Sequence, residues 1–177
     1  MSIVNILVGL PGSGKTTYAR YLEEHDKCVR ISKDDFVHIP SRIPVEQRMK
    51  DAIVDCLESN KDIVFDSTNI TRQKRSWIVK LAREHDAQVN ICVLDISAKK
   101  CKKQNEKKPT REQVSEQAID RMEQAFMYPE EDEYDTIQVI NSKWFSNHSK
   151  SIKKIIGNDD KYKQELKEKI NKIRFGL

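Results

Sequence analysis

Apolar residues recur along the first 140 positions in two alternating patterns. Short apolar runs, each typical of a strand buried on both faces, occur at Ile3–Val8, Cys28–Ser32, Lys61–Asp66, Ala87–Ile96 and Thr136–Ile140. Segments with an apolar residue every three or four positions predict helices at Thr16–His25, Val45–Asn60, Thr71–His85 and Ser97–Lys108. A further helix is predicted to begin at a capping box formed by Thr110 and Gln113.

This alternation of strands and helices predicts an α/β fold. Strand–helix–strand units connect right-handedly and run parallel, so we expect a parallel sheet of about five strands sandwiched by helices. The chain has 177 residues, the size of one ordinary domain. We assign residues 1–141 to this domain and residues 142–177 to a C-terminal extension, in which Asp160–Arg174 is predicted to form an amphipathic helix.

The most specific motif lies between the first strand and the first helix. Residues 9–16 read GLPGSGKT and match the P-loop pattern G-x-x-x-x-G-K-[ST] in full. Glycines let successive backbone N–H groups curl around a phosphate, and the following helix directs its positive end at the same anion. The residues predicted to bind a nucleotide are Gly9, Pro11, Gly12, Ser13, Gly14, Lys15, Thr16 and Thr17.

The distribution of glycine excludes one large class of P-loop protein. A Ras-like GTPase needs a DxxG switch glycine, but this chain has no glycine between Gly14 and Gly157. The segment Asn60-Lys61-Asp62 resembles the start of a guanine-reading NKxD motif, with its aspartate one position early. We therefore expect a small kinase rather than a GTP-dependent switch.

Acidic residues follow two predicted strands at the sheet edge where ligands of open α/β sheets bind. Asp34 and Asp35 follow the second strand, where a carboxylate can accept the proton of a hydroxyl that attacks a γ-phosphate. Asp66 ends the third strand, the position of an acid that helps to hold Mg²⁺, and Thr68 and Asn69 are then expected to line the acceptor site. Solvated loop acids and an ordinary helix cap are the alternative interpretations.

The net charge of +4 hides an uneven distribution. Residues 98–111 carry seven basic residues and one acid, whereas residues 112–135 carry nine acids and one basic residue. A basic segment after the fourth strand acts as a lid over the phosphates in small phosphoryl-transfer enzymes, so we expect a helical lid at about residues 97–111. A solvated helix face is the alternative.

The C-terminal extension is a second basic segment. Residues 142–177 carry ten basic residues and four acids. We expect salt-sensitive binding of the acceptor, or contacts in an oligomer, and the alternative is a solvated helix packed on the sheet edge.

Overall composition is that of a globular protein, with 37% hydrophobic and 34% charged residues. No apolar run approaches the ~20 residues of a membrane span, so no membrane association is expected. The four cysteines lie far apart and form no CxxC pair, which argues against zinc and disulfide frameworks and favours a reducing cytoplasm.

Together these segments resemble the phage-type polynucleotide 5′-kinase family over about residues 2–141. The matching segments are GLPGSGKTT at 9–17, ISKDDF at 31–36, FDSTN at 65–69, the lid ending in Lys107-Lys108, and YDTIQVI at 134–140. Members of this family are P-loop kinases that transfer the γ-phosphate of ATP to the 5′-hydroxyl of DNA or RNA. The resemblance implies ATP and Mg²⁺ as cofactors and a nucleic-acid 5′ end as substrate. It implies no phosphatase domain like the one fused to some members, because the chain ends too soon.

The resemblance also implies roles for individual residues. Asp34, the first acid of its pair, matches the general base. Lys15 and the lid residue Lys108 match cations that bind the phosphates, while Thr16 and Asp66 match the positions that support Mg²⁺.

Two positions depart from the family pattern. Lys108 stands where the family usually has a lid arginine, and a lysine keeps the charge but loses the bidentate fork, so Arg111 is a second candidate for the lid cation. The arginine that family members place just after Asp-Asp-aromatic is missing, and Arg42 or Arg48 would have to bind the acceptor's phosphate instead.

The sequence thus predicts an ATP-dependent kinase of nucleic-acid 5′-hydroxyl ends, with Asp34 as general base. A P-loop kinase of a small-molecule or nucleoside acceptor is the first alternative. The second is a non-catalytic ATP-binding adaptor that binds nucleic acid through its lysine-rich tail.

Overall fold

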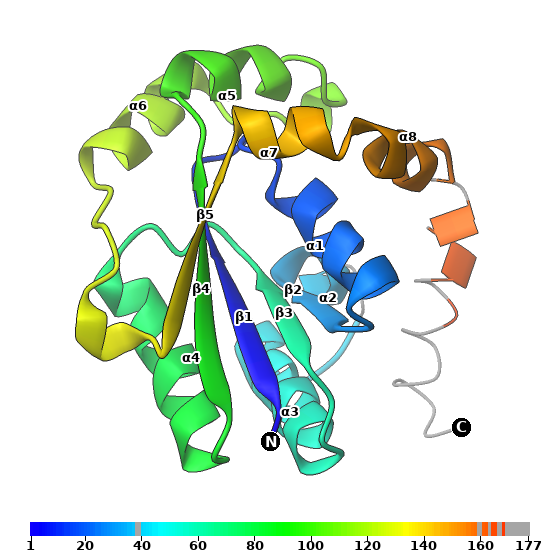
Figure 1. Cartoon of the computed structure of the whole chain (residues 1–177), viewed down its shortest axis with the longest axis vertical. Coiled ribbons are helices and arrows are strands. Elements are labelled where there is room, and N and C mark those ends of the chain that lie inside the picture. The colour runs from blue at the N-terminus through cyan, green and yellow to red at the C-terminus, as the bar shows by residue number, and fades with distance from the viewer. Residues whose placement is uncertain (38–39, 159–160, 163, 166–167, 169–177) are drawn as a thin grey trace.

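The computed structural model of the chain has a single sheet covered by helices (Figure 1). It describes residues 1–37, 40–158, 161, 162, 164, 165 and 168. The strands are β1 (Ile3–Val8), β2 (Val29–Ser32), β3 (Ile63–Asp66), β4 (Gln88–Asp95) and β5 (Thr136–Asn141). The longer helices are α1 (Lys15–His25), α3 (Val45–Glu58), α4 (Arg72–Glu84), α5 (Ala98–Asn105), α6 (Glu116–Gln124) and α8 (Ser149–Gly157). The shorter elements are α2 (Lys33–Val37), α7 (Ser142–Asn147) and the 3-10 turns η1 (Thr110–Glu112) and η2 (Glu131–Glu133).

The five strands form one parallel sheet in the order β2-β3-β1-β4-β5. This confirms the predicted α/β fold with a parallel sheet of about five strands. After β1 the chain first forms the two strands on one side of it, β2 at the edge and β3 in between. It then forms β4 and β5 on the other side. Ligands of open α/β sheets bind beyond the carboxyl ends of the strands at such a reversal, which places the expected site beside the end of β1.

Three polar side chains inside the sheet fix the register of its central strands. Asn5 of β1 faces Asn90 of β4, which in turn faces Thr136 of β5. Asn90 Nδ2 donates to Asn5 Oδ1 at 2.7 Å, and Thr136 Oγ1 donates to Asn90 Oδ1 at 2.9 Å. A slip by one residue would leave the buried amides of Asn5 and Asn90 without these partners, so this polar ladder opposes every other register.

Helices cover both faces of the sheet. On one face, Ile53 of α3 and Ile78 of α4 are fully buried in a core with Ile6 of β1. On the other, Tyr18 and Leu22 of α1 form a second core with residues of β1, β3 and β4. Each fully buried side chain of this size contributes about 1.5–3 kcal/mol, so the two cores hold the strand ends that carry the site in place.

The predicted start of a helix at Thr110 is wrong. Residues 110–112 form only the short turn η1, and α6 begins after Ser115, whose Oγ accepts a hydrogen bond from the backbone N–H of Ala118 at 3.3 Å. The side chain of Gln113 donates instead to the carbonyl oxygens of Glu106 and Lys108, at 3.0 and 2.8 Å. The Gln113 side chain is thus directed at the carbonyls of the preceding segment, and no helix continues from Thr110 for it to cap.

The extension after β5 is more regular than its sequence pattern suggested. Helices α7 and α8 cross over α1 (Figure 1). The rings of Tyr18 and Tyr21 of α1 meet the edge of Trp144 of α7 at centroid distances of 4.9 and 5.0 Å, and Trp144 stacks on His148 at 4.1 Å. The predicted helix at residues 160–174 lies largely outside the described residues. Within the described part of the chain, no helix is both long and apolar enough to cross a bilayer.

Candidate functional site

The predicted P-loop follows β1 directly and turns into α1. Gly12 and Gly14 have φ values of +84° and +93°, a left-handed conformation that other residues adopt only with strain. Gly14 is also the N-cap of α1, so the loop ends on the free N–H groups of an eleven-residue helix. The backbone therefore has the form of an anion-binding loop.

Three neighbouring segments lie close against this loop. A Cβ atom on Gly12 would lie 2.2 Å from the carbonyl oxygen of Cys101 in α5, and one on Gly14 would lie 2.7 Å from Cζ of Phe145 in α7. The backbone N–H of Gly9 donates to the carbonyl oxygen of Thr68, which follows β3, at 3.1 Å. Helix α5, helix α7 and the loop after β3 thus enclose the P-loop.

The side chain of Lys15 is buried within the loop. Its ammonium donates to the carbonyl oxygens of Gly9 and Leu10, at 2.9 and 2.6 Å. Burial lowers the pKa of Lys15 from 10.5 to about 8, with the nearby carboxylate of Asp66 opposing the shift and the cation of Lys108 adding to it. The structure therefore brings Lys15, Asp66 and the predicted lid residue Lys108 into one electrostatic neighbourhood.

Beside the P-loop, a buried arginine connects both predicted acidic positions. The Arg30 guanidinium, from β2, donates through Nε to Asp66 Oδ2 at 2.9 Å and through Nη1 to Asp35 at 3.1 Å, and its Nη2 lies 2.9 Å from Asp66 Oδ2. Burial disfavours its charge, but the carboxylates of Asp66 and Asp35 outweigh that cost and raise the pKa of Arg30. Arg30 Nη1 also lies 3.4 Å from the hydroxyl of Tyr162, which donates to Glu23 of α1 at 2.9 Å.

Two predicted metal-binding residues offer suitable oxygen atoms. Mg²⁺ usually takes one or two protein oxygens and completes its octahedron with waters and phosphates. Thr16 is exposed at the start of α1, and Asp66 has one oxygen bound to Arg30 while its Oδ1 accepts no hydrogen bond from the described residues. These two residues fit a phosphate-bound Mg²⁺. Among the described residues, no cluster of three His, Cys, Asp or Glu could hold a metal without a substrate.

The predicted acceptor side is more open. Asp34 lies exposed in the first turn of α2, next to the paired Asp35. Arg42 is exposed between α2 and α3, whereas Arg48 donates to the carbonyl oxygen of Phe36 at 3.0 Å and so supports α2. The general-base candidate therefore faces solvent, with one exposed arginine on the segment that follows it.

The polar residues of the loop after β3, which were predicted to line the acceptor site, form hydrogen bonds within the protein. Asn69 is buried with a φ of +45°, and its amide donates to the carbonyl oxygen of Leu7 at 2.9 Å. Thr68 is half-buried and contributes its carbonyl oxygen to Gly9. In this structure the Asn69 amide joins the loop to β1, and Thr68 is the more exposed residue of the two.

Sequence reasoning missed Arg30 and Phe145. Arg30 had a signal, because a cation inside a short buried strand needs acidic partners and two acidic positions follow nearby. Phe145 had none, since its contact with Gly14 spans more than 130 residues of sequence. Lys108 and Arg111, the two lid candidates, are both exposed, and Arg111 lies 3.8 Å from Glu112.

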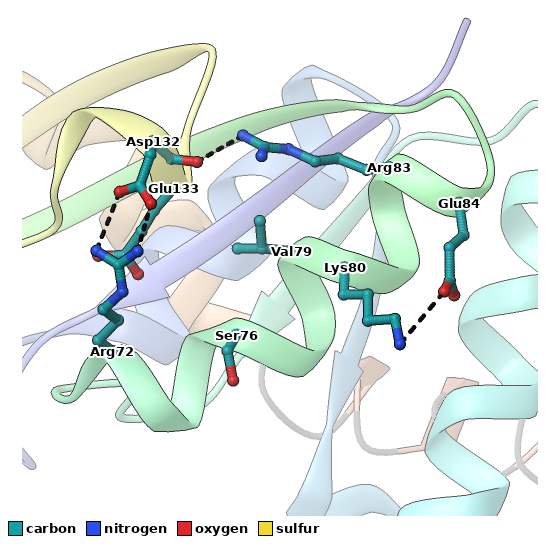
Figure 2. Close-up of a pocket in the computed structure, with 8 residues that line it drawn as sticks. All are labelled: Arg72, Ser76, Val79, Lys80, Arg83, Glu84, Asp132 and Glu133. Carbon is teal, nitrogen blue, oxygen red and sulfur yellow. Dashed lines mark hydrogen bonds and ion pairs between the residues drawn. The ribbon is translucent and has the colours of Figure 1, made fainter.

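A separate hollow of about 520 Å³ lies between α4 and η2, away from these residues (Figure 2). Two of its cations pair with carboxylates: Arg72 pairs with Asp132, and Lys80 lies 3.7 Å from Glu84. Next to it, the fully buried Arg75 binds both oxygens of Glu133 at 2.8 and 2.9 Å. The pairs of Arg72 and Arg75 tie α4 to the segment before β5, and none of the predicted site residues lines the hollow.

Comparison with known proteins gives a family match and one partial relative. Residues 4–129 match the family described as an AAA domain. The 2′,3′-cyclic-nucleotide 3′-phosphodiesterase of Mus musculus is 35% identical over 91 residues, which is 48% of this chain and 22% of that protein. The chain therefore matches only about a fifth of this relative's length.

Solved structures of several kinds of kinase share the fold of this chain. A fungal RNA kinase superposes with a TM-score of 0.60 at 13% identity, over 98% of this chain and 96% of that one. A gluconokinase from Sinorhizobium meliloti 1021 superposes with a TM-score of 0.56 at 15% identity, over 92% and 96% of the two chains. At these identities the likeness shows a shared P-loop kinase fold.

Proposed function

The chain belongs to the AAA domain family, and from that premise we propose that it transfers the γ-phosphate of ATP to the 5′-hydroxyl end of DNA or RNA. The observation that carries the proposal is the placement of buried Lys15 in the P-loop after β1 and of Asp66 at the end of the neighbouring strand β3, with exposed Asp34 at the same edge of the sheet. A kinase needs cations for the transferred phosphate and a carboxylate that an acceptor hydroxyl can reach.

In this proposal each side chain has one task. Lys15 leaves the carbonyl oxygens of its own loop and binds the phosphates, and Lys108 neutralises charge on the transferred group from the lid. Asp34 orients the 5′-hydroxyl and accepts its proton, while the neighbouring Asp35 takes the contact with Arg30. Thr16 and Asp66 would hold Mg²⁺, which supplies charge neutralisation between the phosphates when bound.

Support for a nucleic-acid acceptor is the resemblance of five segments to polynucleotide 5′-kinases, and the likeness to a fungal RNA kinase that extends over nearly the whole chain. The phosphodiesterase activity in the name of the mouse relative is not proposed, because the match covers 22% of that protein.

The test offers γ-labelled ATP with three acceptors: a 5′-hydroxyl oligonucleotide, a nucleoside 3′-monophosphate and a panel of small alcohols. We expect label on the oligonucleotide. Label found only on the small alcohols would contradict the proposal.

The Asp34→Asn variant tests the general base. It keeps the size of the side chain but cannot accept the proton, so we expect transfer to fall by about 10²–10⁴-fold while ATP affinity is unchanged. Full activity of this variant would overturn the assignment of Asp34. If neither wild type nor variant labels any acceptor but both bind ATP, the chain is an ATP-binding adaptor.

A small-molecule or nucleoside acceptor is the second candidate. It is favoured by the few cations open to an acceptor phosphate on the described segment after Asp34, where Arg42 is exposed but Arg48 is engaged with Phe36. The fold likeness to a gluconokinase agrees with it. The same acceptor panel separates the two candidates.

A further inference from the structure

Two basic segments that lie far apart in the sequence meet above the P-loop. Lys100 of α5 donates its Nζ to Ser142 Oγ at the start of α7, a 3.0 Å bond across 42 positions of sequence. From there α7 continues into α8 across α1 (Figure 1). The lid and the extension, which the sequence analysis treated separately, therefore share one surface.

The parts of the two segments that form this surface contain no acidic residue. Residues 96–105 carry four lysines and no Asp or Glu, and residues 136–158 likewise carry four lysines and none. Acids from neighbouring elements reach two of these cations: Asp120 of α6 lies 2.6 Å from Lys102, and Glu24 of α1 lies 3.3 Å from Lys154. The other six form no ion pair with the described residues and are exposed; we call them the basic ridge: Lys99, Lys100, Lys103, Lys143, Lys150 and Lys153.

The arrangement of the ridge suits an extended polyanion. Lys99 and Lys103 are four positions apart on α5, and Lys150 and Lys153 are three apart on α8, so each pair projects from one face of its helix. The bond between Lys100 and Ser142 joins these helices through α7. Six like charges on one surface repel each other, and a partner of repeated negative charge relieves that repulsion.

The helices that carry the ridge also enclose the P-loop. Helix α5 contacts Gly12 through the Cys101 carbonyl, and α7 contacts Gly14 through Phe145. Lys99, Lys103 and Lys143 each lie two positions from these contacts, on another face of their helices. A chain of phosphates on the ridge would therefore run along the outer side of the helices that enclose the phosphate site.

We propose that the basic ridge binds the phosphodiester backbone of the nucleic-acid acceptor, which rests on the proposed function. The contact reads charge and not bases, so it adds affinity that grows with strand length and falls with salt. It leaves Asp34 and the P-loop to act on the strand's end.

The experiment measures binding of a fluorescent single-stranded 5′-hydroxyl oligonucleotide to the full chain by anisotropy at several salt concentrations. The test variant is Lys143→Ala/Lys150→Ala/Lys153→Ala. Its matched control is Lys61→Ala/Lys74→Ala/Lys80→Ala, which removes three exposed lysines from α4 and the turn before β3. We expect the slope of log affinity against log salt to become shallower by about 2 in the test variant, because each lysine contributes about 0.7 on a single strand, and to stay unchanged in the control.

A second readout separates this inference from the proposed kinase activity. Phosphorylation of a nucleoside 3′-monophosphate, which is too short to reach the ridge, should be equal in wild type and test variant. Equal slopes for wild type and test variant would contradict binding of the strand by the ridge, whether or not the chain is a kinase. An equally reduced slope in the control variant would contradict it as well. A reduced slope without phosphorylation of any acceptor would support the ridge and contradict the kinase.

Discussion

The two sides of the candidate site are built differently. On the nucleotide side, the P-loop is enclosed by α5, α7 and the loop after β3, and Lys15 is buried with its hydrogen bonds satisfied. On the acceptor side, Asp34 and Arg42 are exposed on short or irregular segments. Between the two sides stands the buried group of Arg30, Asp66 and Asp35.

The difference corresponds to what each side of the candidate site has to bind. A phosphate is the same in every nucleotide, so its site can be prearranged by backbone and packing. The acceptor varies between kinases of this fold, and its site lies on segments that can change without disturbing the sheet. The comparison predicts that substitutions on the nucleotide side affect both folding and binding, whereas those on the acceptor side affect the acceptor alone.

The largest effect is expected from Lys15→Met. Removing the buried cation takes away the positive charge that neutralises the transferred phosphate, and transfer should fall by about 10²–10³-fold. The measurement is the rate of label transfer from ATP to the preferred acceptor. Retention of more than a tenth of the activity would contradict the role of Lys15.

Gly12→Ala is the next substitution on the same side. Its Cβ would meet the carbonyl oxygen of Cys101 at 2.2 Å, and the positive φ strains any side chain. We expect a loss of about 1–3 kcal/mol in the free energy of unfolding together with weaker ATP binding. Denaturant unfolding and calorimetric titration measure the two quantities.

Gly157→Ala is the matched control, because nothing lies within 4 Å of a Cβ there and the residue ends α8. It should leave ATP binding unchanged and stabilise the fold by up to about 1 kcal/mol. Equal effects of the two glycine substitutions on stability and ATP binding would contradict the claim that Gly12 lies in an enclosed loop and Gly157 at an open helix end.

Arg42→Ala tests the acceptor side. If Arg42 binds an acceptor phosphate, its loss should raise the acceptor KM by about tenfold, in line with a hydrogen bond to a charged group, without changing the ATP KM or the unfolding free energy. Arg48→Ala should instead lower stability, because Arg48 holds the carbonyl of Phe36. A raised ATP KM in Arg42→Ala would contradict the separation of the nucleotide side from the acceptor side.

The smallest effect is a pH dependence on the nucleotide side. Since burial lowers the pKa of Lys15 to about 8, the free protein increasingly loses this charge above that pH, and ATP affinity should fall about fivefold between pH 8 and pH 9. The same lowered pKa affects folding stability in the opposite direction. The folded chain releases this proton before the unfolded one, so the unfolding free energy of wild type relative to Lys15→Met should rise between pH 8 and 10.5. A flat ATP affinity across pH 8–9 would contradict the lowered pKa.

Local patterns predicted the fold and the P-loop well. Strand runs, helical stripes and the contiguous GLPGSGKT motif each depend on residues close together in sequence. The capping box at Thr110 failed because Gln113 found nearer carbonyl partners. Contacts such as Arg30 with Asp66, or Phe145 with Gly14, arise only when distant segments meet, and no pattern within one segment specifies them.

Trp144 gives the chain a built-in optical signal. The protein has two tryptophans, and Trp77 packs against Phe65 on the opposite face of the sheet. Trp144 stands 5.2 Å from the ring of Phe145, which touches Gly14 of the P-loop. In a Trp77→Phe protein, the remaining indole fluorescence would report directly on the loop, so nucleotide arrival could be followed in real time without a label.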